Sequence, residues 1–186
     1  MRILVILLLI LISLQSCQRQ DLEVNRSDPA LHLKNGVLHY QGKPFNGTLF
    51  AKHDFDTYKM KIAYKDGRKD GLEQQWYLNG EIAQFRTYHK GVKVGNHLGW
   101  WPNGTPKFAY TFNDEGAYHG KREEWYKNGQ LVLSFNYVDG KEQGRQRMWN
   151  DTGKIKANYD VVGNERFGLI GLKKCYTLNI NSNEIK

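Results

Sequence analysis

Hydrophobic and polar positions alternate with a period of two between residues 64 and 163, and turn residues interrupt the alternation every ten to thirteen residues. Short alternating runs predict β-strands, because successive side chains of a strand point to opposite faces of the sheet. In the first pair of strands the alternation predicts one apolar face, interrupted only by Gln74, and one face that mixes rings with charge. The apolar face contains Leu72, Trp76, Leu78, Ala83 and Phe85, and the other contains Glu73, Tyr77, Ile82, Arg86 and Tyr88.

The same pattern returns every 24 or 25 residues. A tryptophan marks each period, with one glycine five residues before it and another four residues after it. A fixed period of this size indicates an array of identical supersecondary units that pack only against their neighbours. We therefore expect an all-β protein, an elongated antiparallel β-meander of stacked hairpin repeats. The repeat positions are Gly71, Trp76, Gly80, Gly95, Trp100, Gly104, Gly120, Trp125, Gly129, Gly144, Trp149 and Gly153.

The turns of these hairpins predict how their strands are paired. Asn-Gly occupies one turn in three successive units, and Thr152-Gly153 takes that place in the fourth. Asn-Gly between β-like runs is typical of a two-residue type I′ turn, in which both residues have positive φ. The resulting register places a glycine opposite an aromatic ring, which we expect to cover it. The predicted pairs are Gly71–Tyr88, Gly95–Phe112 and Gly120–Tyr137, whereas Gly144 in the fourth hairpin faces Val161.

The repeat also suggests how the chain is divided. An earlier and degenerate unit is visible, because Tyr40 precedes Tyr64 by 24 residues and Gly47 precedes Gly71 by 24. Atypical terminal units are typical of capping repeats. We expect a signal peptide at 1–16, a lipidated cysteine and polar tether at 17–28, a capping repeat at 29–63, four hairpin repeats at 64–163 and a C-terminal cap at 164–186.

The repeated motif reads Tyr-x-x-Gly-x-x-x-Gly-x-x-x-x-Trp-Tyr-x-Asn-Gly from Tyr64 to Gly80. It resembles the MORN-repeat variant of bacterial envelope proteins, including the YwqK-like group. The resemblance extends over about residues 40–168. It implies an elongated antiparallel sheet of stacked hairpins, and it implies use of that sheet as an interaction scaffold.

The N-terminus differs from the repeats. Arg2 precedes an apolar run from Ile3 to Leu14, whose 12 positions are fewer than the roughly 20 that span a membrane. The run ends at Leu14-Gln15-Ser16-Cys17, which resembles the bacterial lipoprotein signal. That resemblance implies acylation of Cys17 and anchoring of an exported protein to a membrane of the cell envelope. In the enterobacterial pattern an aspartate after the cysteine retains lipoproteins in the inner membrane. Because residue 18 is glutamine, an outer-membrane lipoprotein is the expected form in a host with two membranes. The alternative is an ordinary secreted protein in which Cys17 is incidental.

Composition and charge limit the chemistry only in part. The net charge of +8 suits an acidic partner surface, but scattered lysines also protect exposed strands from edge-to-edge pairing. No phosphate-binding loop and no nucleophile elbow occur, so we expect no enzyme and no cofactor. His89, His97 and His119 occupy non-equivalent repeat positions, so we expect no metal site. Glu123 and Glu124 are neighbours on a strand and are expected on opposite faces, in structural roles.

Aromatic side chains are the remaining candidates for binding. We interpret the tryptophan row as packing between repeats. Two functions remain open: a protein-binding scaffold, or a module that binds carbohydrate or anionic lipid with its aromatic and basic face. An exported location disfavours nucleic acid, and the oligomeric state is not indicated. For Cys175, a buried inert thiol is favoured over a reactive one. The candidate binding face consists of Tyr77, Tyr88, Trp101, Tyr126 and Tyr137.

Overall fold

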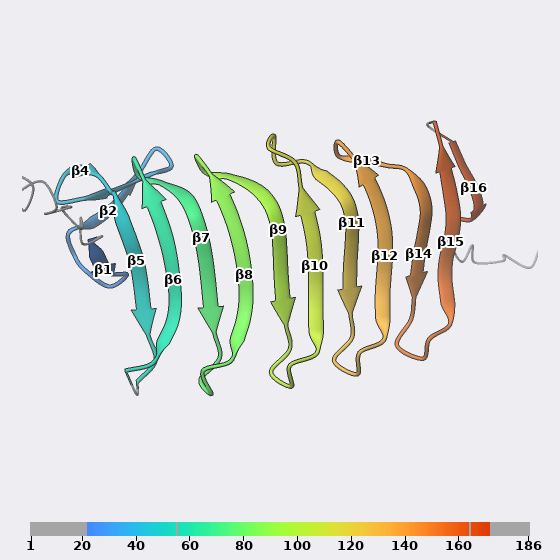
Figure 1. The fold of residues 1–186 in the computed structure, drawn as a ribbon, viewed down its shortest axis with the longest axis horizontal. Coiled ribbons are helices and arrows are strands. Elements are labelled where there is room, and N and C mark those ends of the chain that lie inside the picture. Colours follow the sequence, from blue (N-terminus) through green and yellow to red (C-terminus); the bar gives the residue numbers. More distant parts are fainter. Residues whose placement is uncertain (1–21, 55, 164, 172–186) are drawn as a thin grey trace, which may run out of the picture.

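The computed structural model describes residues 22–54, 56–163 and 165–171, and every regular element in these ranges is a β-strand. The all-β prediction is thus confirmed. Thirteen strands form one long sheet, in which neighbours follow chain order and run antiparallel except at its first strand (Figure 1). The strands are β1 (Glu23–Asn25), β5 (Gly47–Lys52), β6 (Tyr58–Lys65), β7 (Arg68–Trp76), β8 (Ile82–His89), β9 (Val92–Trp100), β10 (Pro106–Phe112), β11 (Tyr118–Trp125), β12 (Leu131–Val138), β13 (Lys141–Glu142), β14 (Gly144–Trp149), β15 (Ile155–Val162) and β16 (Glu165–Leu169).

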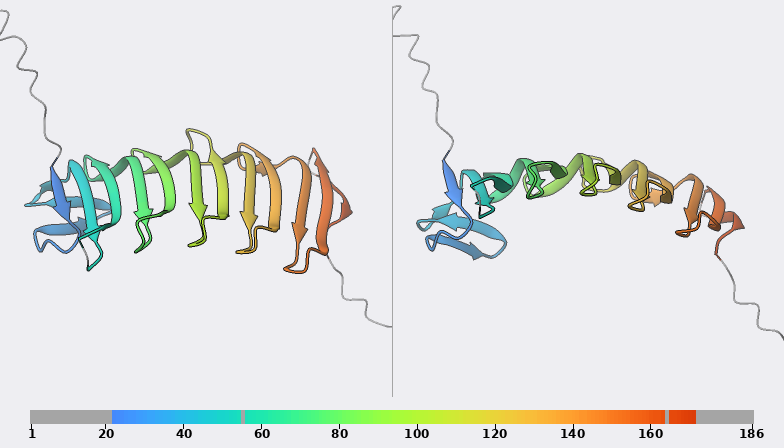
Figure 2. Two further views of the ribbon diagram at one scale, coloured as in Figure 1. Left: turned by 60° about the horizontal axis from the view of Figure 1, so that its bottom comes forward. Right: turned by 90° about the horizontal axis from the view of Figure 1, so that it is seen from below.

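A second sheet of three strands lies against the N-terminal end of the long sheet. It consists of β2 (Leu31–Lys34), β3 (Val37–Tyr40) and β4 (Lys43–Pro44). The long sheet is a single arched layer, and the small sheet lies on the inner side of the arch (Figure 2). We call the side of the long sheet that carries the small sheet the inner face and the opposite side the outer face. A layer of this kind leaves most of both faces without a second layer to pack against.

Two small clusters take the place of a central core. The first lies between the two sheets and contains Val24, Phe45, Leu49, Met60 and Ile62. The second lies at the other end of the long sheet and is formed by Ala157, Tyr159 and Val161, with Met148 against it. The two ends are therefore held by apolar burial, whereas the middle repeats depend on their neighbours.

The N-terminal boundary differs from the expected tether. Residues 23–25 belong to the predicted tether, yet they form β1, which pairs in parallel with β5. Val24 is 3% exposed and is the register partner of Leu49. The Lys61 ammonium also lies 2.8 Å from the Glu23 carboxylate. The sequence does not reveal this strand, because it is short and polar and only one of its side chains is buried.

The register of the hairpins is as predicted, but the turn type is not. Gly71 pairs with Tyr88, and the equivalent pairs follow in the next two hairpins. The turn itself has three residues, since Tyr77 N–H donates to Glu81 O (2.8 Å) and Gly80 N–H donates to Tyr77 O (3.0 Å). Only Gly80 of the Asn-Gly pair has positive φ, so the type I′ prediction is wrong. A bulge beyond the Trp76–Ile82 pair shifts the register by one residue, and this shift restores the predicted pairs.

Type I′ geometry occurs instead at the opposite edge of the sheet. There, two-residue loops have positive φ at both positions, as the mirror-image turn requires. These loops are Asp66-Gly67, Lys90-Gly91 and Asp139-Gly140. At the Asn-Gly edge the Asn79 Oδ1 atom accepts the Glu81 N–H at 3.1 Å, which stabilises the three-residue loop locally.

The expected cover of glycine by an aromatic ring occurs at a different pair. Gly120 faces Tyr137, but a Cβ at Gly120 would meet only Thr111, at 3.8 Å. Gly120 lies where the pairing of β11 with β10 shifts, and its φ of 96° is one that only glycine adopts easily. A ring does cover Gly99, because a Cβ there would overlap the side chain of Phe108, its cross-strand partner.

Candidate functional site

One equivalent repeat position, occupied by His53 in the first unit and by the residue after the tryptophan in the next three, links its hairpin to the following one. The Tyr77 hydroxyl donates to Trp100 O at 2.7 Å, and His53 Nε2 lies 3.3 Å from Trp76 O. These carbonyls flank the three-residue loops, where the strand ladder ends and a backbone acceptor needs another partner. The link uses side chains of three types at one equivalent position. Further along the sheet, Trp101 Nε1 donates to Trp125 O at 3.0 Å and the Tyr126 hydroxyl donates to Trp149 O at 3.4 Å.

A row of polar side chains runs along the inner face, two residues after each bulge glycine. Glu73 is 3% exposed, His97 is 2% exposed and Gln146 is fully buried, while Arg122 at the equivalent place is half-buried. Each has a hydrogen-bond partner, as buried polar groups require. Sequence reasoning missed this row because its members differ in type, although their spacing is that of the repeat. The contacts are Lys69 Nζ–Glu73 (2.5 Å), His97 Nε2–Thr87 O (2.8 Å), Arg122–Glu124 (2.7 Å) and Gln146–Asn136 O (2.9 Å).

Burial and hydrogen bonding shift the pKa values of side chains in this row and beside it. Burial acts to raise the pKa of Glu73, but hydrogen bonds from Lys69 and Gln75 more than offset it, so the pKa lies below its ordinary value. Burial lowers the pKa of His97, and the Thr87 carbonyl only partly opposes this. Burial and the Glu124 carboxylate together raise the pKa of Tyr110. Near neutral pH the row therefore holds an ionised carboxylate and a neutral imidazole, and the neighbouring Tyr110 phenol stays protonated.

Packed rings accompany the polar row on the inner face. Tyr88 contacts His97 at a centroid distance of 5.4 Å, and His97 contacts Phe112 at 4.7 Å. Further rings continue the series to Tyr118 and Tyr137. Tyr88 is only 8% exposed, so its ring packs between repeats and is not free for a ligand.

The five residues of the candidate binding face therefore do not form one surface. Tyr77, Trp101 and Tyr126 lie at the loop edge, where their polar atoms contact carbonyls of the following repeat. Tyr88 and Tyr137 lie near the other edge, within the packed rings. Alternation correctly places side chains on a face, but it does not show how far along the strands they lie from one another.

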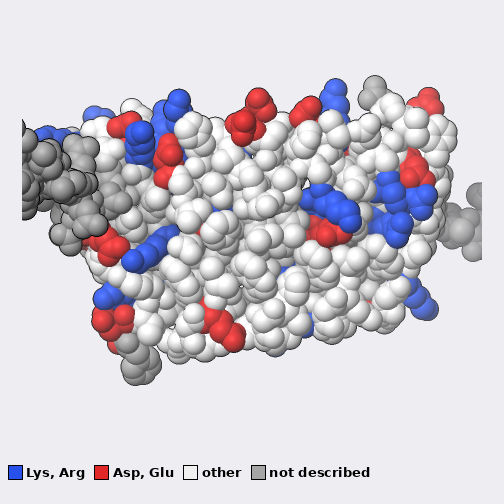
Figure 3. All heavy atoms as spheres, viewed as in Figure 1, with Lys and Arg blue, Asp and Glu red and all other residues white. Residues whose placement is uncertain are grey.

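The outer face is the broad uncharged surface of the central repeats (Figure 3). The described chain places no second layer on it. Leu72 is 43% exposed there, and its partner Thr87 lies beside it. Ion pairs border this area at both ends: Glu23–Lys61 at the first strands, and Lys121–Glu123 and Arg145–Asp160 at the last. The face predicted to be apolar from Leu72, Trp76 and Phe85 is thus the uncovered one, while the mixed face holds the buried rings.

Groups with possible catalytic or metal-binding chemistry are dispersed. His89 lies 3.5 Å from Asp70 and His119 lies 3.1 Å from Asp139, at separate turns. In the described ranges no three metal-ligating side chains come together. Glu123 accepts a hydrogen bond from Ser134, whereas Glu124 accepts from Tyr110 on the other face. Nor does that part of the chain contain a helix long and apolar enough to cross a membrane.

Both cysteines, Cys17 and Cys175, lie outside the described residues. The expectations of acylation at Cys17 and of an inert thiol at Cys175 therefore stay predictions.

Comparison with known proteins supports the repeat at one hairpin. A family model described as a MORN repeat variant matches residues 118–139. These residues comprise β11, the Asn128-Gly129 turn and β12, one complete hairpin of the long sheet. No curated protein matches the chain.

Proposed function

We propose that this protein is a non-catalytic β-repeat scaffold, anchored by lipid in the bacterial cell envelope, that binds a protein partner through its outer face. The observation that carries the proposal is the uncharged area over β7–β10 (Figure 3). The cores of protein–protein interfaces are depleted in charge and enriched in aromatic side chains. Leu72, which is 43% exposed within this area, adds exposed apolar surface of the kind found at interaction sites.

Two features of the sheet suit it to this use. The area is built from paired strands, so the side chains of Leu72, Phe85 and Leu98 are held by the ladder before a partner arrives. Preorganised side chains lose little conformational entropy on binding. Ion pairs at both ends of the area give it a polar boundary, which is the arrangement of an interface rim.

The proposed location rests on the N-terminal sequence. The apolar run that ends at Leu14-Gln15-Ser16-Cys17 supports acylation of Cys17. The resemblance to lipoproteins implies three acyl chains, and two membrane-binding signals already anchor a protein stably. Replacing Cys17 by serine tests this directly. We expect loss of acylation and release of the protein from the membrane fraction at high salt. A Cys17→Ser protein that is processed and sediments like the parent would contradict the anchor without affecting the outer-face proposal.

The alternative, a carbohydrate- or lipid-binding module that uses the tyrosine face, depends on five aromatic residues lying on one surface. Its five aromatic residues are divided between the loop edge and the packed rings. The outer face carries no Lys or Arg side chains over its central repeats (Figure 3).

Photocrosslinking in intact cells tests the proposed interface. A crosslinking residue is introduced at Leu72 and separately at Thr87, its cross-strand partner, with Lys127 at an exposed hairpin loop as the matched control. We expect the same protein to be captured from the first two positions, and its capture to be lost when Leu98 is replaced by arginine. Capture of the same protein from Lys127 with equal yield, or no common adduct at Leu72 and Thr87, would refute the proposal.

A further inference from the structure

A groove of about 860 Å³ lies between the small sheet and the inner face of β5–β7. Its volume falls in the range of about 300–1,000 Å³ that is typical of small-molecule sites. Backbone hydrogen bonds fix its walls, because Leu38 N–H donates to Gly67 O and Gly67 N–H donates to Phe45 O, both at 2.8 Å. The groove is therefore a permanent feature of the fold.

The floor and one wall of the groove are apolar. Leu49, Met60 and Ile62 form the floor, and all three are buried. Leu33 of β2 belongs to the lining and is 73% exposed, and Val92 of β9 is exposed at the opposite rim. Contact of the exposed Leu33 and Val92 side chains with water is unfavourable. An apolar ligand in the groove would remove that contact.

The polar part of the lining is strongly cationic. It contains Arg26, Arg68, Lys69 and Lys90, against Glu73 as its one carboxylate. Glu73 is already occupied by Lys69, whose Nζ atom lies 2.5 Å from it. Within the described ranges the charged groups of the other three have no carboxylate within 4.0 Å. The nearby Asp70 carboxylate accepts the backbone N–H of Lys90 at 3.1 Å. A surplus of positive charge beside an apolar floor is the complement of an amphiphilic anion.

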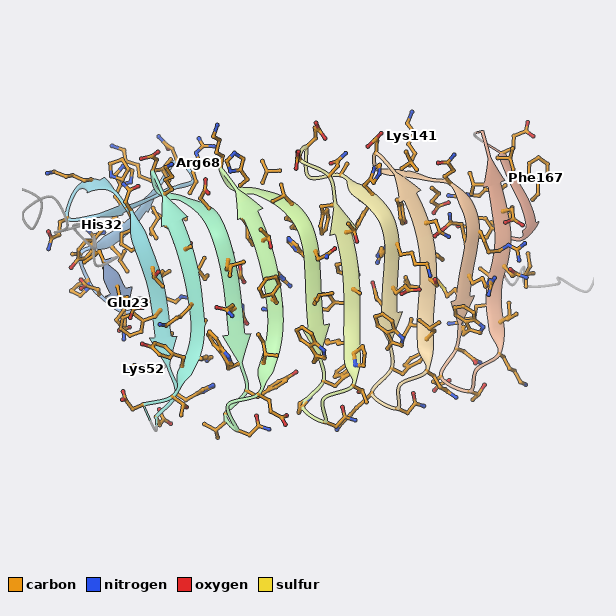
Figure 4. The ribbon with its side chains drawn as sticks, in the orientation of Figure 1. Glu23, His32, Lys52, Arg68, Lys141 and Phe167 are labelled. Carbon is orange, nitrogen blue, oxygen red and sulfur yellow. The ribbon has the colours of Figure 1, made fainter. Side chains whose placement is uncertain are left out.

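Two of these cations come from adjacent turns at one edge of the long sheet. Arg68 begins β7 (Figure 4), and a Cβ at Gly91, directly after Lys90, would lie 3.8 Å from Arg68 Cβ. Both residues therefore reach the rim from adjacent turns. An anionic head held there by charge-assisted hydrogen bonds leaves its apolar tail over Leu49 and Met60.

We propose that this groove binds an amphiphilic anion with a single apolar chain, its head at Arg68 and Lys90 and its chain along the floor of Leu49, Met60 and Ile62. The small sheet supplies one wall, so the site belongs to this chain's own N-terminal elements and is separate from the outer face. Its volume, within the range of small-molecule sites, favours one free amphiphile over a bilayer surface.

Isothermal titration with laurate tests the proposal, with the purified chain carrying Cys17→Ser so that no anchor of its own competes. Laurate is used below the concentration at which it forms micelles. We expect saturable binding of one laurate per chain. Dodecyl maltoside, which has an uncharged head and an alkyl chain longer by a single methylene, should bind at least about tenfold more weakly, because its head makes no charge-assisted hydrogen bond. Inorganic phosphate alone should not displace laurate.

Matched variants assign the binding to the groove. Arg68→Glu with Lys90→Glu should weaken laurate binding at least about tenfold, whereas Lys127→Glu with Lys141→Glu makes the same charge change away from the lining and should leave it unchanged. Leu33→Asp should weaken binding through the wall. Because Leu33 is so exposed, this variant should unfold in denaturant like the parent.

Four outcomes would overturn the proposal: no saturable laurate binding, equal affinity for the two detergents, displacement by phosphate, or equal loss in both charge-reversal pairs. Phosphatidylglycerol vesicles test whether the anionic head and apolar chain are presented by a lipid bilayer and not by a free amphiphile. If the chain sediments with these vesicles in a manner that depends on Arg68 and Lys90, and does not bind laurate, then the two residues belong to a membrane-contact surface. That result would refute the groove proposal.

Discussion

Replacing Gly99 by alanine should destabilise this protein only because of the ring that lies over it. A Cβ at Gly99 would overlap the Phe108 side chain, so the ring must move away. Phe108 stacks on Tyr110 at a centroid distance of 4.8 Å, and the Arg86 guanidinium lies 5.7 Å from its centre, so displacement disrupts these contacts as well. Overpacking of this kind costs about 1–3 kcal/mol. Loss of the ring pair adds about 0.5–1.5 kcal/mol.

The effect should reverse its sign when the ring is removed. Gly99 does not have positive φ, so alanine fits its backbone. In a Phe108→Ala background, Gly99→Ala should therefore stabilise the protein by about 0.4–1 kcal/mol, because alanine reduces the freedom of the unfolded chain. Denaturant unfolding of the four proteins of this double-mutant cycle gives the coupling between the two sites, which we expect to be about 2 kcal/mol or more. If Gly99→Ala had the same effect with and without the ring, the cover of Gly99 by Phe108 would be refuted.

Three further predictions concern the repeat and its polar row. Gly120→Val should lower the free energy of unfolding by about 1–3 kcal/mol through backbone strain at the φ of 96°. Adding Tyr137→Ala should not relieve the loss, and a Gly120→Val protein as stable as the parent would contradict the strain. Tyr77→Phe should lower the free energy of unfolding by about 1 kcal/mol, because it removes a hydrogen bond of 2.7 Å, and Tyr126→Phe should lower it less, because that contact is 3.4 Å. Equal losses of stability in thermal unfolding would argue against the hydrogen bonds between repeats. Burial lowers the pKa of His97 below 6.5, so the unfolded chain takes up a proton at this histidine before the folded protein does as the pH falls. The free energy of unfolding should therefore decline below about pH 6.5. His97→Gln should flatten this decline between about pH 7.5 and 5, and an unchanged slope would exclude His97 as its source.

The sequence predicted the fold and the strand register because both follow from periodic signals. Glycine and tryptophan spacing fixes the repeat length, and the pairing of Gly71 with Tyr88 follows from where a turn stands. The turn type was wrong, since Asn79 stabilises its loop through its side chain and does not adopt positive φ. The correct register resulted because a bulge after Ile82 compensates for the extra loop residue.

The candidate site was harder to predict because it depends on what packs against each face. Leu72, Trp76 and Phe85 form an apolar face in sequence, but no pattern in the chain shows that this face remains uncovered. Glu73 and His97 look like surface residues, yet their neighbours bury them. The groove depends on contacts between residues 31–38 and residues 67–92, which no local pattern reveals.

The links at the loop edge make the length of this protein adjustable in whole units. At this equivalent position the side chain reaches forward to the same carbonyl of the following unit, whether it is His53, Tyr77 or Trp101. Because the acceptor is always a backbone atom, one unit can be exchanged, duplicated or excised and the next still offers a matching partner. A gene encoding such a chain can lengthen or shorten by recombination between its own repeats. Its product would then span a different distance, while the groove formed with the small sheet stays intact at its N-terminal end.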